Sequence, residues 1–386
     1  MKIAFFISAM GHGSGGHFHS LNHISQVLGN YHNVKIISFG PGRSKIIESN
    51  PYFCKHINFN GINLISFYRN IKLFSKEFDP DIYHCFDEEC YNLIRIIISS
   101  RTHRIILNRC GGQNPIGFPH AYNLILFSYE NYEWFRKQKR YNSSNVVLVP
   151  NRVKPIELDR TYNPISKQKA IFNFLRICRI NSLYEKSIRD SFNLIKYLHS
   201  RNIRVAKLYI VGVIEDKEVY QDLAKHPFVR NGNIVFLNDS IYTTEASRML
   251  YLADAVIGSG RGIMEAASLG LPILAINAKG EIPVLLNEAN FCDAFKTNFS
   301  SRNVFRENNE DINKENIIRM IIDNKFYSEL SRFSKDVFDK YFDVNKAKEK
   351  YEEVYRNSEN GRRFILSDRI YIIKTFYHFY FSNQTK

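Results

Sequence analysis

Two cations that follow an apolar run have the chemistry to bind a diphosphate. Arg179 and Lys186 come shortly after Phe174–Cys178, which we predict to be a strand. A guanidinium binds phosphate through a planar fork, and an ammonium binds it as a point charge. Taken alone, the pair is equally well explained as two solvated surface charges. We favour phosphate binding because further loops of the chain suit the same ligand.

A glycine turn in the second half of the chain is the next candidate. Ser259-Gly260-Arg261-Gly262 follows the apolar run Ala255–Gly258 and leads into a predicted helix. The first N–H groups of a helix have no partner within the helix and favour phosphate. Glu265, in the first turn, would repel phosphate, so we expect it to bind sugar hydroxyls. Its alternative role is to complement the helix dipole.

Two more loops give weaker signals. Asn277–Glu281, which includes Gly280 and Glu281, follows the strand Ile273–Ile276 and can cover the donor, or be a plain turn. Gly11–His17 follows the first strand, and its glycines let the backbone approach a ligand closely. That loop has the spacing of a dinucleotide-binding fingerprint but lacks the acidic residue expected after the second strand. An ordinary strand–helix turn explains it equally well.

Acidic residues and histidines of the first half carry less weight. Asp79-Pro80-Asp81 imitates a metal-binding motif, but it precedes a strand and we interpret it as a turn. Asp87, Glu88 and Glu89 follow His84; one of them can bind a hydroxyl or act as a base, although a solvated helix start is favoured. Scattered histidines near the glycine loop are weak evidence for a metal. We therefore predict no metal site and no cofactor.

These loops require a scaffold of alternating strands and helices. Such alternation predicts parallel βαβ units and an α/β fold of two doubly wound, Rossmann-like domains facing a cleft. The predicted strands are Ile3–Ser8, Val34–Ser38, Ile82–Cys85, Ile105–Leu107, Leu124–Phe127 and Val146–Val149 in the first half, and Phe174–Cys178, Lys207–Val211, Ile234–Leu237, Ala255–Gly258 and Ile273–Ile276 in the second.

We place the N-terminal domain at residues 1–155, a polar linker with prolines at 156–170, the C-terminal domain at 171–340 and a helical tail at 341–386. The tail ends in the basic, aromatic segment Arg369–Tyr380. A helix packed on the body is the favoured interpretation, and a foot on a membrane surface is the alternative.

The composition limits which binding partners and which cellular compartment we expect. The 386 residues carry a formal net charge of +15, which attracts anions. No zinc-finger or RNA-binding signature and no long Lys/Arg block is present, so we do not expect nucleic acid. Six scattered cysteines without a C-x-x-C pair favour a reducing cytoplasm. We interpret Met1–Met10 as a buried strand rather than a signal peptide, and no stretch is apolar enough to span a bilayer.

The loops together resemble a known family. Gly258–Ile273 looks like the donor-binding segment of GT-B glycosyltransferases, especially the retaining glycosyltransferase family 4 of bacterial polysaccharide and capsule synthesis. Arg179 and Lys186 resemble the phosphate-binding pair of that family, and Gly15-Gly16 resembles its N-terminal glycine loop. Asp81–His84 resembles its strand motif ending in His, and Val149–Val153 the segment that closes its first domain. The ordered set covers nearly the whole chain.

The resemblance implies a chemistry without metal or cofactor. The C-terminal domain would bind the nucleotide sugar and the N-terminal domain the acceptor. Arg179 and Lys186 would stabilise the leaving phosphate, which is electrostatic catalysis, and Glu265 would bind the ribose. Donor contacts would come from Gly15, Gly16, Ser259, Gly260, Arg261, Gly262, Gly280 and Glu281; acceptor or sugar contacts would come from His17, His84, Asp87, Arg109, Gly111 and Gly112.

The chain departs from the family pattern at two places. The first Glu of the E-x7-E pair is replaced by Ile257. The loop after the fifth strand, Asn108–Pro115, lacks the family's His, so Arg109 or the Gly111-Gly112 amides would take over its contacts.

We therefore expect a glycosyltransferase that uses a nucleoside-diphosphate sugar, in the UDP form, and extends a glycan or lipid-linked acceptor. It would act in the cytoplasm, at the inner face of the cell membrane, with an anionic membrane surface as a further partner. A nucleotide-sugar epimerase of the same architecture, or a non-catalytic homologue that binds nucleotide sugar, is the alternative.

Overall fold

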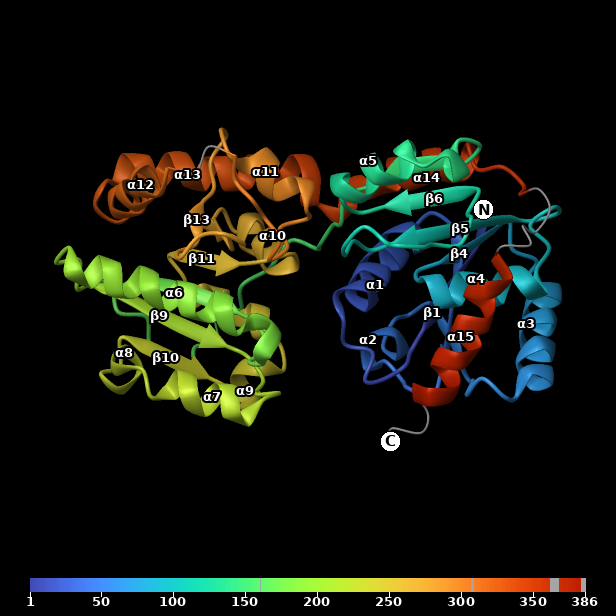
Figure 1. Cartoon of the computed structure of the whole chain (residues 1–386), viewed down its shortest axis with the longest axis horizontal. Helices are drawn as coiled ribbons and strands as arrows, with labels where there is room; N and C mark the ends of the chain where they lie inside the picture. The colour runs from blue at the N-terminus through green and yellow to red at the C-terminus, as the bar shows by residue number, and fades with distance from the viewer. Residues whose placement is uncertain (160, 307–308, 362–367, 383–386) are drawn as a thin grey trace. The chain divides into compact units, whose positions relative to one another are not determined.

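The chain folds into two compact units (Figure 1). The structure, a computed structural model, describes residues 1–159, 161–306, 309–361 and 368–382. Unit 1 comprises Met1–Arg152 and Val344–Lys386, and unit 2 comprises Val153–Asp343. The chain thus leaves unit 1 after Arg152 and returns to it at Val344.

Unit 1 is built on a parallel sheet of seven strands in the order β3–β2–β1–β4–β5–β6–β7. The order reverses direction between β1 and β4, which is the switch point where doubly wound sheets bind ligands. The strands are β1 (Lys2–Ser8), β2 (Asn33–Gly40), β3 (Phe53–Asn58), β4 (Ile82–Cys85), β5 (Arg104–Arg109), β6 (Asn123–Leu126) and β7 (Asn145–Leu148).

Helices follow the strands of unit 1 and return after unit 2. In α3, Phe67, Ile71, Phe74 and Phe78 recur at helical spacing and are buried. The helices are α1 (Gly16–Gly29), α2 (Lys45–Glu48), α3 (Leu64–Phe78), α4 (Glu88–Ile97), α5 (Tyr129–Lys137), α14 (Lys348–Arg356) and α15 (Arg369–Ser382), with short 3₁₀ turns at Lys139–Tyr141 and Val344–Ala347.

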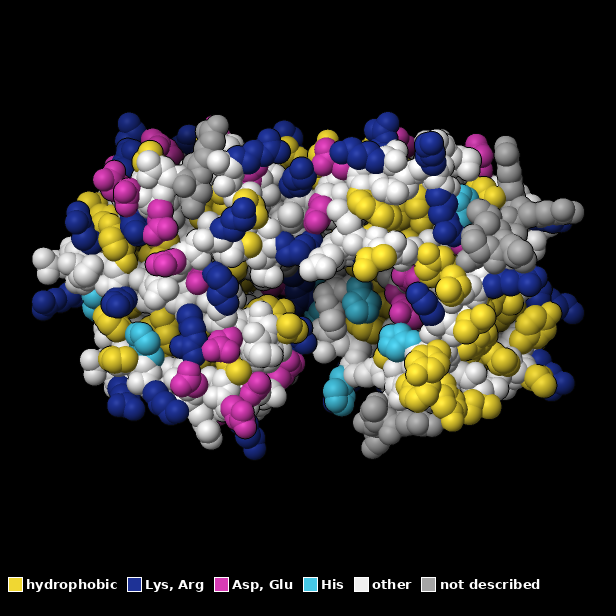
Figure 2. Space-filling view, in the orientation of Figure 1, with side chains coloured by type: hydrophobic (Ala, Val, Ile, Leu, Met, Phe, Trp, Pro, Cys, Tyr) yellow, Lys and Arg dark blue, Asp and Glu magenta, His cyan; other side chains and the backbone are white. Residues whose placement is uncertain are grey.

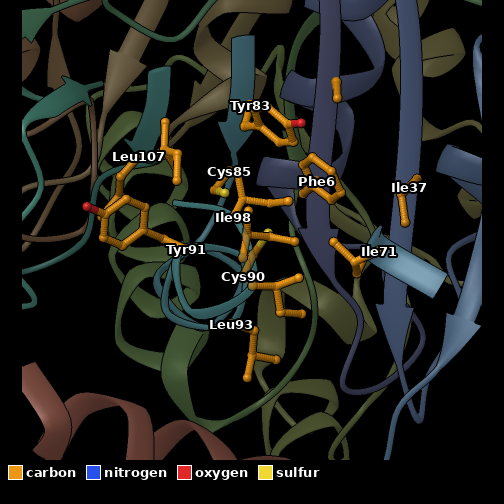
Figure 3. Close-up of a cluster of buried hydrophobic side chains, with 14 of the residues drawn as sticks. Phe6, Ile37, Ile71, Tyr83, Cys85, Cys90, Tyr91, Leu93, Ile98 and Leu107 are labelled. Carbon is orange, nitrogen blue, oxygen red and sulfur yellow. The ribbon is translucent and has the colours of Figure 1, made fainter. Parts of the chain in front are cut away.

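The two faces of the first sheet carry separate cores because side chains alternate along each strand. Phe6 of β1 meets Ile37 of β2 and Ile71 of α3 on one face, beside side chains of β4 and α4 (Figure 3). On the other face, α1 and α14 cover the sheet, and Tyr355 of α14 is fully buried there. The returning segment therefore completes the core of unit 1.

Unit 2 repeats the plan with six strands in the order β10–β9–β8–β11–β12–β13. All pairs are parallel except β12 with β13, and the switch point lies between β8 and β11. The strands are β8 (Phe172–Ile177), β9 (Ala206–Val211), β10 (Ile234–Leu237), β11 (Ala255–Gly258), β12 (Ile273–Ala275) and β13 (Val284–Leu285).

The helices of unit 2 pack on both faces of its sheet. Asn181 caps the longest, α6, by accepting hydrogen bonds from the backbone N–H groups of Leu183 and Tyr184. The helices are α6 (Ser182–Ser200), α7 (Lys217–Ala224), α8 (Pro227–Arg230), α9 (Ser240–Thr243), α10 (Arg261–Ser268), α11 (Phe291–Lys296), α12 (Glu310–Ile322) and α13 (Asn324–Val337), with a 3₁₀ segment at Ala246–Leu252 and a π-helical turn at Phe338–Phe342.

The predicted fold class, two doubly wound α/β units, is confirmed. The polar stretch expected between the domains belongs to unit 2 and packs on the rest of it. The backbone N–H of Ile156 donates to Ser268, and Lys167 donates to the carbonyl of Ala253. Residues Arg369–Ser382 of the predicted tail form α15, which packs against α4 of unit 1. None of the helices within the described residues is long and apolar enough to cross a membrane.

Candidate functional site

A pocket of about 640 Å³ opens at the switch point of unit 1. Its walls are the loops that follow β1, β4 and β5, the start of α1, and one residue of α15. The residues that line it are Ser8, Met10, Gly11, Gly13, Ser14, Gly15, His17, Phe18, Phe86, Asp87, Glu88, Glu89, Asn108, Arg109, Cys110, Gly111, Gly112, Phe118 and His378.

The glycine loop after β1 is held against the loop after β2. The hydroxyl of Ser44 donates a 2.6 Å hydrogen bond to the carbonyl of Gly13. Gly13 has a φ of +56°, and a Cβ there would lie 2.4 Å from that of Ser44. Gly15, in extended conformation, precedes the first residue of α1. The loop is therefore fixed where it passes the pocket, which Gly15 lines and Gly16 does not.

Asp87 is both a structural cap and part of the pocket wall. Its carboxylate accepts hydrogen bonds from the backbone N–H groups of Cys90 at 2.6 Å and Ser8 at 2.7 Å. Burial and the charge of Glu89 raise the pKa of Asp87 to about 7, although these hydrogen bonds act in the opposite direction. Because both oxygens are engaged, Asp87 joins β1 to α4.

Glu88 and Glu89 complete an acidic wall. Burial and the neighbouring Glu89 raise the pKa of Glu88 to about 7, and Arg109 partly offsets them. Glu89 accepts a hydrogen bond of 3.2 Å from His378 of α15, which lowers the pKa of Glu89 and raises that of His378. The pocket therefore contains a carboxyl group that titrates near neutrality, the property expected of a general base.

Arg109 and the two glycines after β5 form another part of the pocket wall. The Arg109 guanidinium donates to the carbonyl of Gln113 at 2.5 Å and lies over the ring of Phe118. Gly111 and Gly112 have φ values of +100° and +90°, conformations that L side chains rarely adopt. The loop thus turns sharply and adds a cation to a pocket that carboxylates also line.

The two histidines predicted in this unit have different places. His17 lines the pocket, and its burial lowers its pKa. His84 is fully buried in β4 and bonds the hydroxyl of Tyr355 at 3.0 Å. Burial lowers the pKa of His84 to about 3, so it is a neutral core residue, and it is not among those that line the pocket.

In unit 2, α10 begins at the carboxyl end of β11. Ser259 and Gly260 form the turn, and Gly260 has a φ of +52°. A Cβ on Gly260 or Gly262 would have no heavy atom within 4 Å, so the space above the first turn of α10 is open. The helix therefore presents its N-terminus at the switch point, as anion sites require.

Glu265 lies in the second turn of α10, and not in the first turn as predicted. It is 6% exposed, and Arg261, one turn earlier, places its Nε 3.0 Å from Oε1. Burial raises the pKa of Glu265, and Arg261 partly offsets that effect. The pair is thus fixed on α10.

Lys186, a residue of α6, contacts the loop after β12. Its ammonium donates to the carboxylate of Asp190 at 2.8 Å and to the carbonyl of Gly280 at 2.9 Å. The carbonyl of the next residue, Glu281, accepts from Asn193 of α6 at 3.1 Å. An ammonium has three donors, so these two contacts leave Lys186 one donor for a ligand.

Arg179 lies at the carboxyl end of β8. It pairs with Glu215 at 3.4 Å and stacks on the ring of Tyr184, with 57% of its side chain exposed. Arg176, within β8 itself, is fully buried and donates to the carbonyl and hydroxyl of Ser187. Arg176, which the sequence analysis did not single out, ties β8 to the turn of α6 that carries Lys186.

The predicted residues thus fall into two groups. Unit 1 gathers Gly15, His17, Asp87, Arg109, Gly111 and Gly112 around one pocket; unit 2 places Arg179, Lys186, Ser259, Gly260, Arg261, Gly262, Glu265, Gly280 and Glu281 in or near the loops after β8, β11 and β12. Glu88 and Glu89, which the sequence analysis considered with Asp87 as a hydroxyl ligand or a base, also line the pocket. Asn108 and His378 line it too, and neither was singled out from the sequence. Within the ranges that the structure describes, no three His, Cys, Asp or Glu residues are placed to hold a metal ion.

Comparisons with known proteins support the fold. No protein-family model and no curated protein matches the chain. Among solved structures, Anabaena HepE in complex with UDP is similar with a TM-score of 0.66 and 12% identity, over 92% of this chain and 100% of that one. A glycosyltransferase from Rickettsia africae has a TM-score of 0.63 and 16% identity, over 92% and 97%. WaaG, a glycosyltransferase of lipopolysaccharide biosynthesis, has a TM-score of 0.57 and 13% identity, over 92% and 100%. The chain therefore has the GT-B fold of these enzymes.

Proposed function

We propose that this protein is a glycosyltransferase that moves a sugar from a nucleoside-diphosphate sugar, in the UDP form, to a glycan or lipid-linked acceptor during surface polysaccharide synthesis. The observation that carries the proposal is the arrangement at the carboxyl edge of the second sheet. Two cations, Arg179 and Lys186, and the open N-terminus of α10 follow the adjacent strands β8 and β11. HepE, which shares the fold, has been solved with UDP and with UDP-glucose.

Unit 2 is suited to hold the donor. The first N–H groups of α10 point along the helix axis toward the open space above Gly260 and Gly262, where a diphosphate fits. Glu265 would accept hydrogen bonds from the ribose hydroxyls, and Arg261 holds its carboxylate in place. Gly280 and Glu281 would cover the donor from the loop after β12.

The leaving diphosphate would be stabilised by fixed positive charge. Arg179 is held by Glu215 and Tyr184, and Lys186 is held by Asp190 and Gly280. Neither side chain would therefore have to lose rotational freedom when negative charge develops on the leaving diphosphate. Such preorganised stabilisation is worth several kcal/mol in enzymes. We propose on this basis that transfer needs no metal ion, and from the family resemblance that it retains the anomeric configuration.

Unit 1 would bind the acceptor in its pocket. Glu88 could accept the proton of an acceptor hydroxyl, because its pKa of about 7 suits a base at neutral pH. Arg109 and the amides of Gly111 and Gly112 would bind further polar groups of the acceptor or the donor sugar. We place the reaction at the cytoplasmic face of the cell membrane, where nucleotide sugars are available.

Calorimetry tests the donor site. Purified protein is titrated with UDP, GDP and ADP and with their common sugar conjugates. We expect selective binding of the uridine forms, weakened at least tenfold in Arg179→Ala and Lys186→Ala. Matched controls are Arg306→Ala, which removes an exposed arginine with a similar ion pair to Asp293, and Lys225→Ala. Folded protein that binds no nucleotide would refute the proposal.

Product analysis separates transfer from the alternatives. A transferase releases UDP faster when an acceptor is added, and added chelator does not change the rate. An epimerase converts the sugar nucleotide without any acceptor. Ile257, at the position of the family's first Glu, is buried in β11, so a protein that binds UDP-sugar without turnover is the second candidate.

A further inference from the structure

Unit 1 exposes an apolar surface over three helices. We define the docking surface as Leu64 and Tyr68 of α3, Ile96 of α4, and Ile370, Ile373 and Tyr377 of α15; all six side chains are exposed. Figure 2 shows hydrophobic side chains gathered over α3 and α15. A groove of about 680 Å³ runs between these helices and is lined by Leu64, Tyr68, Ile96 and Ile373 among others. Exposed apolar patches of this kind mark interaction sites.

Helix α15 is apolar on its outer face as well as its inner face. Phe379 is buried, and its ring centroid lies 4.9 Å from that of Phe59. On the outer face, Ile370 is 54% exposed, Ile373 66% and Tyr377 64%. A helix that is hydrophobic on all sides is normally covered on all sides. Unit 1 covers one side of α15, so the other side fits a second apolar medium.

The charged side chains around the docking surface are mostly basic. Arg69, Lys72 and Lys76 are exposed on α3, and Arg369 and Lys374 are exposed on α15. The only acidic residue of α3 is Glu77, and α15 contains no Asp or Glu. The two acidic residues of α4, Glu88 and Glu89, line the pocket of unit 1. The apolar surface is thus bordered by a basic rim, which is complementary to a negatively charged partner with an apolar interior.

We propose that the docking surface binds the surface of an anionic lipid bilayer. Isoleucines would enter the boundary between headgroups and acyl chains, tyrosines would lie at headgroup level, and the basic rim would pair with lipid phosphates. A protein partner could match the apolar face, but the aromatic residues together with a rim of lysine and arginine are typical of interfacial membrane binding.

The same helix also reaches the proposed acceptor pocket. His378 of α15 lines that pocket and bonds Glu89, whereas Tyr377 beside it belongs to the docking surface. Docking would therefore place the pocket within one helix width of the lipid headgroups. If the proposed function holds, the acceptor is a lipid-linked glycan whose hydrocarbon chain stays in the bilayer.

Vesicle flotation of the full chain tests the proposal. The probes are vesicles of phosphatidylcholine alone and vesicles of phosphatidylcholine and phosphatidylglycerol in equal parts. We expect flotation only with the anionic vesicles, and its loss in high salt, which screens the basic rim. Lys374→Ala should lower partitioning about fivefold, and Ile370→Ser with Ile373→Ser on the order of tenfold or more.

Matched substitutions on unit 2 provide the control. Ile312 and Ile322 of α12 are 55% and 67% exposed, so Ile312→Ser with Ile322→Ser makes the same chemical change on an equally exposed helix. Lys217→Ala, on exposed Lys217 of α7, matches Lys374→Ala. The controls should float like the unaltered protein. Thermal unfolding must show that every variant is folded, and UDP calorimetry must give one affinity for all of them.

Three results would overturn the proposal. The first is no flotation with anionic vesicles. The second is equal loss in the α15 and α12 variants. The third is a concentration-dependent dimer, seen by light scattering, that the α15 variants abolish while vesicle binding is absent; the surface would then join two copies of the chain. Because flotation needs no donor, its outcome is independent of the proposed enzymatic activity.

Discussion

His378 Nδ1 of α15 lies 3.2 Å from Glu89 Oε1 of α4, although 289 residues separate them in the chain. This pair joins the last helix of unit 1 to the wall of its pocket. Glu89 raises the pKa of His378 above 6.5, and His378 helps to lower that of Glu89. The charged form of this contact therefore requires the proton of His378, whose pKa Glu89 raises.

The first prediction concerns this proton. Because the folded-state pKa of His378 is raised, the charged pair stabilises α15 fully below about pH 6.5 and loses that contribution as pH rises through the folded pKa. Backbone amides of α15 should therefore exchange faster, relative to intrinsic rates, at about pH 8 than at about pH 6. His378→Gln should remove most of this difference in hydrogen-exchange measurements. The pocket carboxyls also titrate here, so an unchanged pH profile in His378→Gln would assign the effect to them instead.

A second prediction concerns Glu88. Its folded pKa of about 7 lies above the ordinary 4.5, so the protein loses stability as pH rises from about 4.5 to about 7. Glutamine resembles the neutral carboxyl, and Glu88→Gln should be more stable than the unaltered protein at about pH 8, by roughly 1 to 3 kcal/mol. The difference should shrink toward pH 5. Urea unfolding across pH measures it, with Glu77→Gln on exposed α3 as the control.

If Glu88 is the base, the same variant should be more stable and yet slower. Its transfer rate should fall on the order of a hundredfold, with UDP affinity unchanged. Equal rates would assign proton acceptance to another group of the pocket.

The third prediction contrasts two arginines of one segment. Arg176 is fully buried and bonded to Ser187 and Ser191, whereas Arg179 is largely exposed. Arg176→Ala removes buried hydrogen bonds and leaves a cavity, which should cost about 3 kcal/mol of unfolding free energy. Arg179→Ala should cost less than about 0.5 kcal/mol. Denaturant midpoints decide this, and similar losses in both variants would contradict the assigned roles.

Much of the fold could be predicted because its strands follow from short, local sequence patterns. Short apolar runs ended by glycine or polar loops identified β1, β4, β8 and β11, and their carboxyl ends hold most of the predicted residues. The strand β3 was not predicted, because its sequence, with Lys55 and His56, lacks an apolar run.

Long-range contacts explain what sequence reasoning did not find. His84 follows the pattern of a site residue, but Tyr355, from the returning end of the chain, accompanies it in the core. His378 reaches the pocket from the tail, and no local spacing connects it with Glu89. The shift of Glu88 to a pKa of about 7 depends on burial, which single-sequence patterns do not give.

The fourth prediction uses two glycines that follow strands of unit 2. A Cβ on Gly262 would have no heavy atom within 4 Å, and the residue lies in the first turn of α10. Gly262→Ala should therefore keep or raise stability, by up to about 1 kcal/mol, because alanine favours the helix. A Cβ on Gly212 would lie 1.7 Å from the carbonyl oxygen of Cys178, so Gly212→Ala must displace the backbone beside Arg179.

The two variants should separate folding from binding. If the diphosphate approaches the backbone of α10, the added methyl of Gly262→Ala occupies the space of the ligand. UDP affinity should then fall at least tenfold, or about 1.4 kcal/mol. The variant should unfold at no lower temperature than the unaltered protein. Gly212→Ala should lose stability, and its affinity should fall only through the unfolded or rearranged fraction. Thermal unfolding and calorimetry on the same samples give both quantities. A Gly262→Ala protein that binds UDP unchanged would place the nucleotide away from the N-terminus of α10, because no packing effect can compensate for a methyl group in an occupied site.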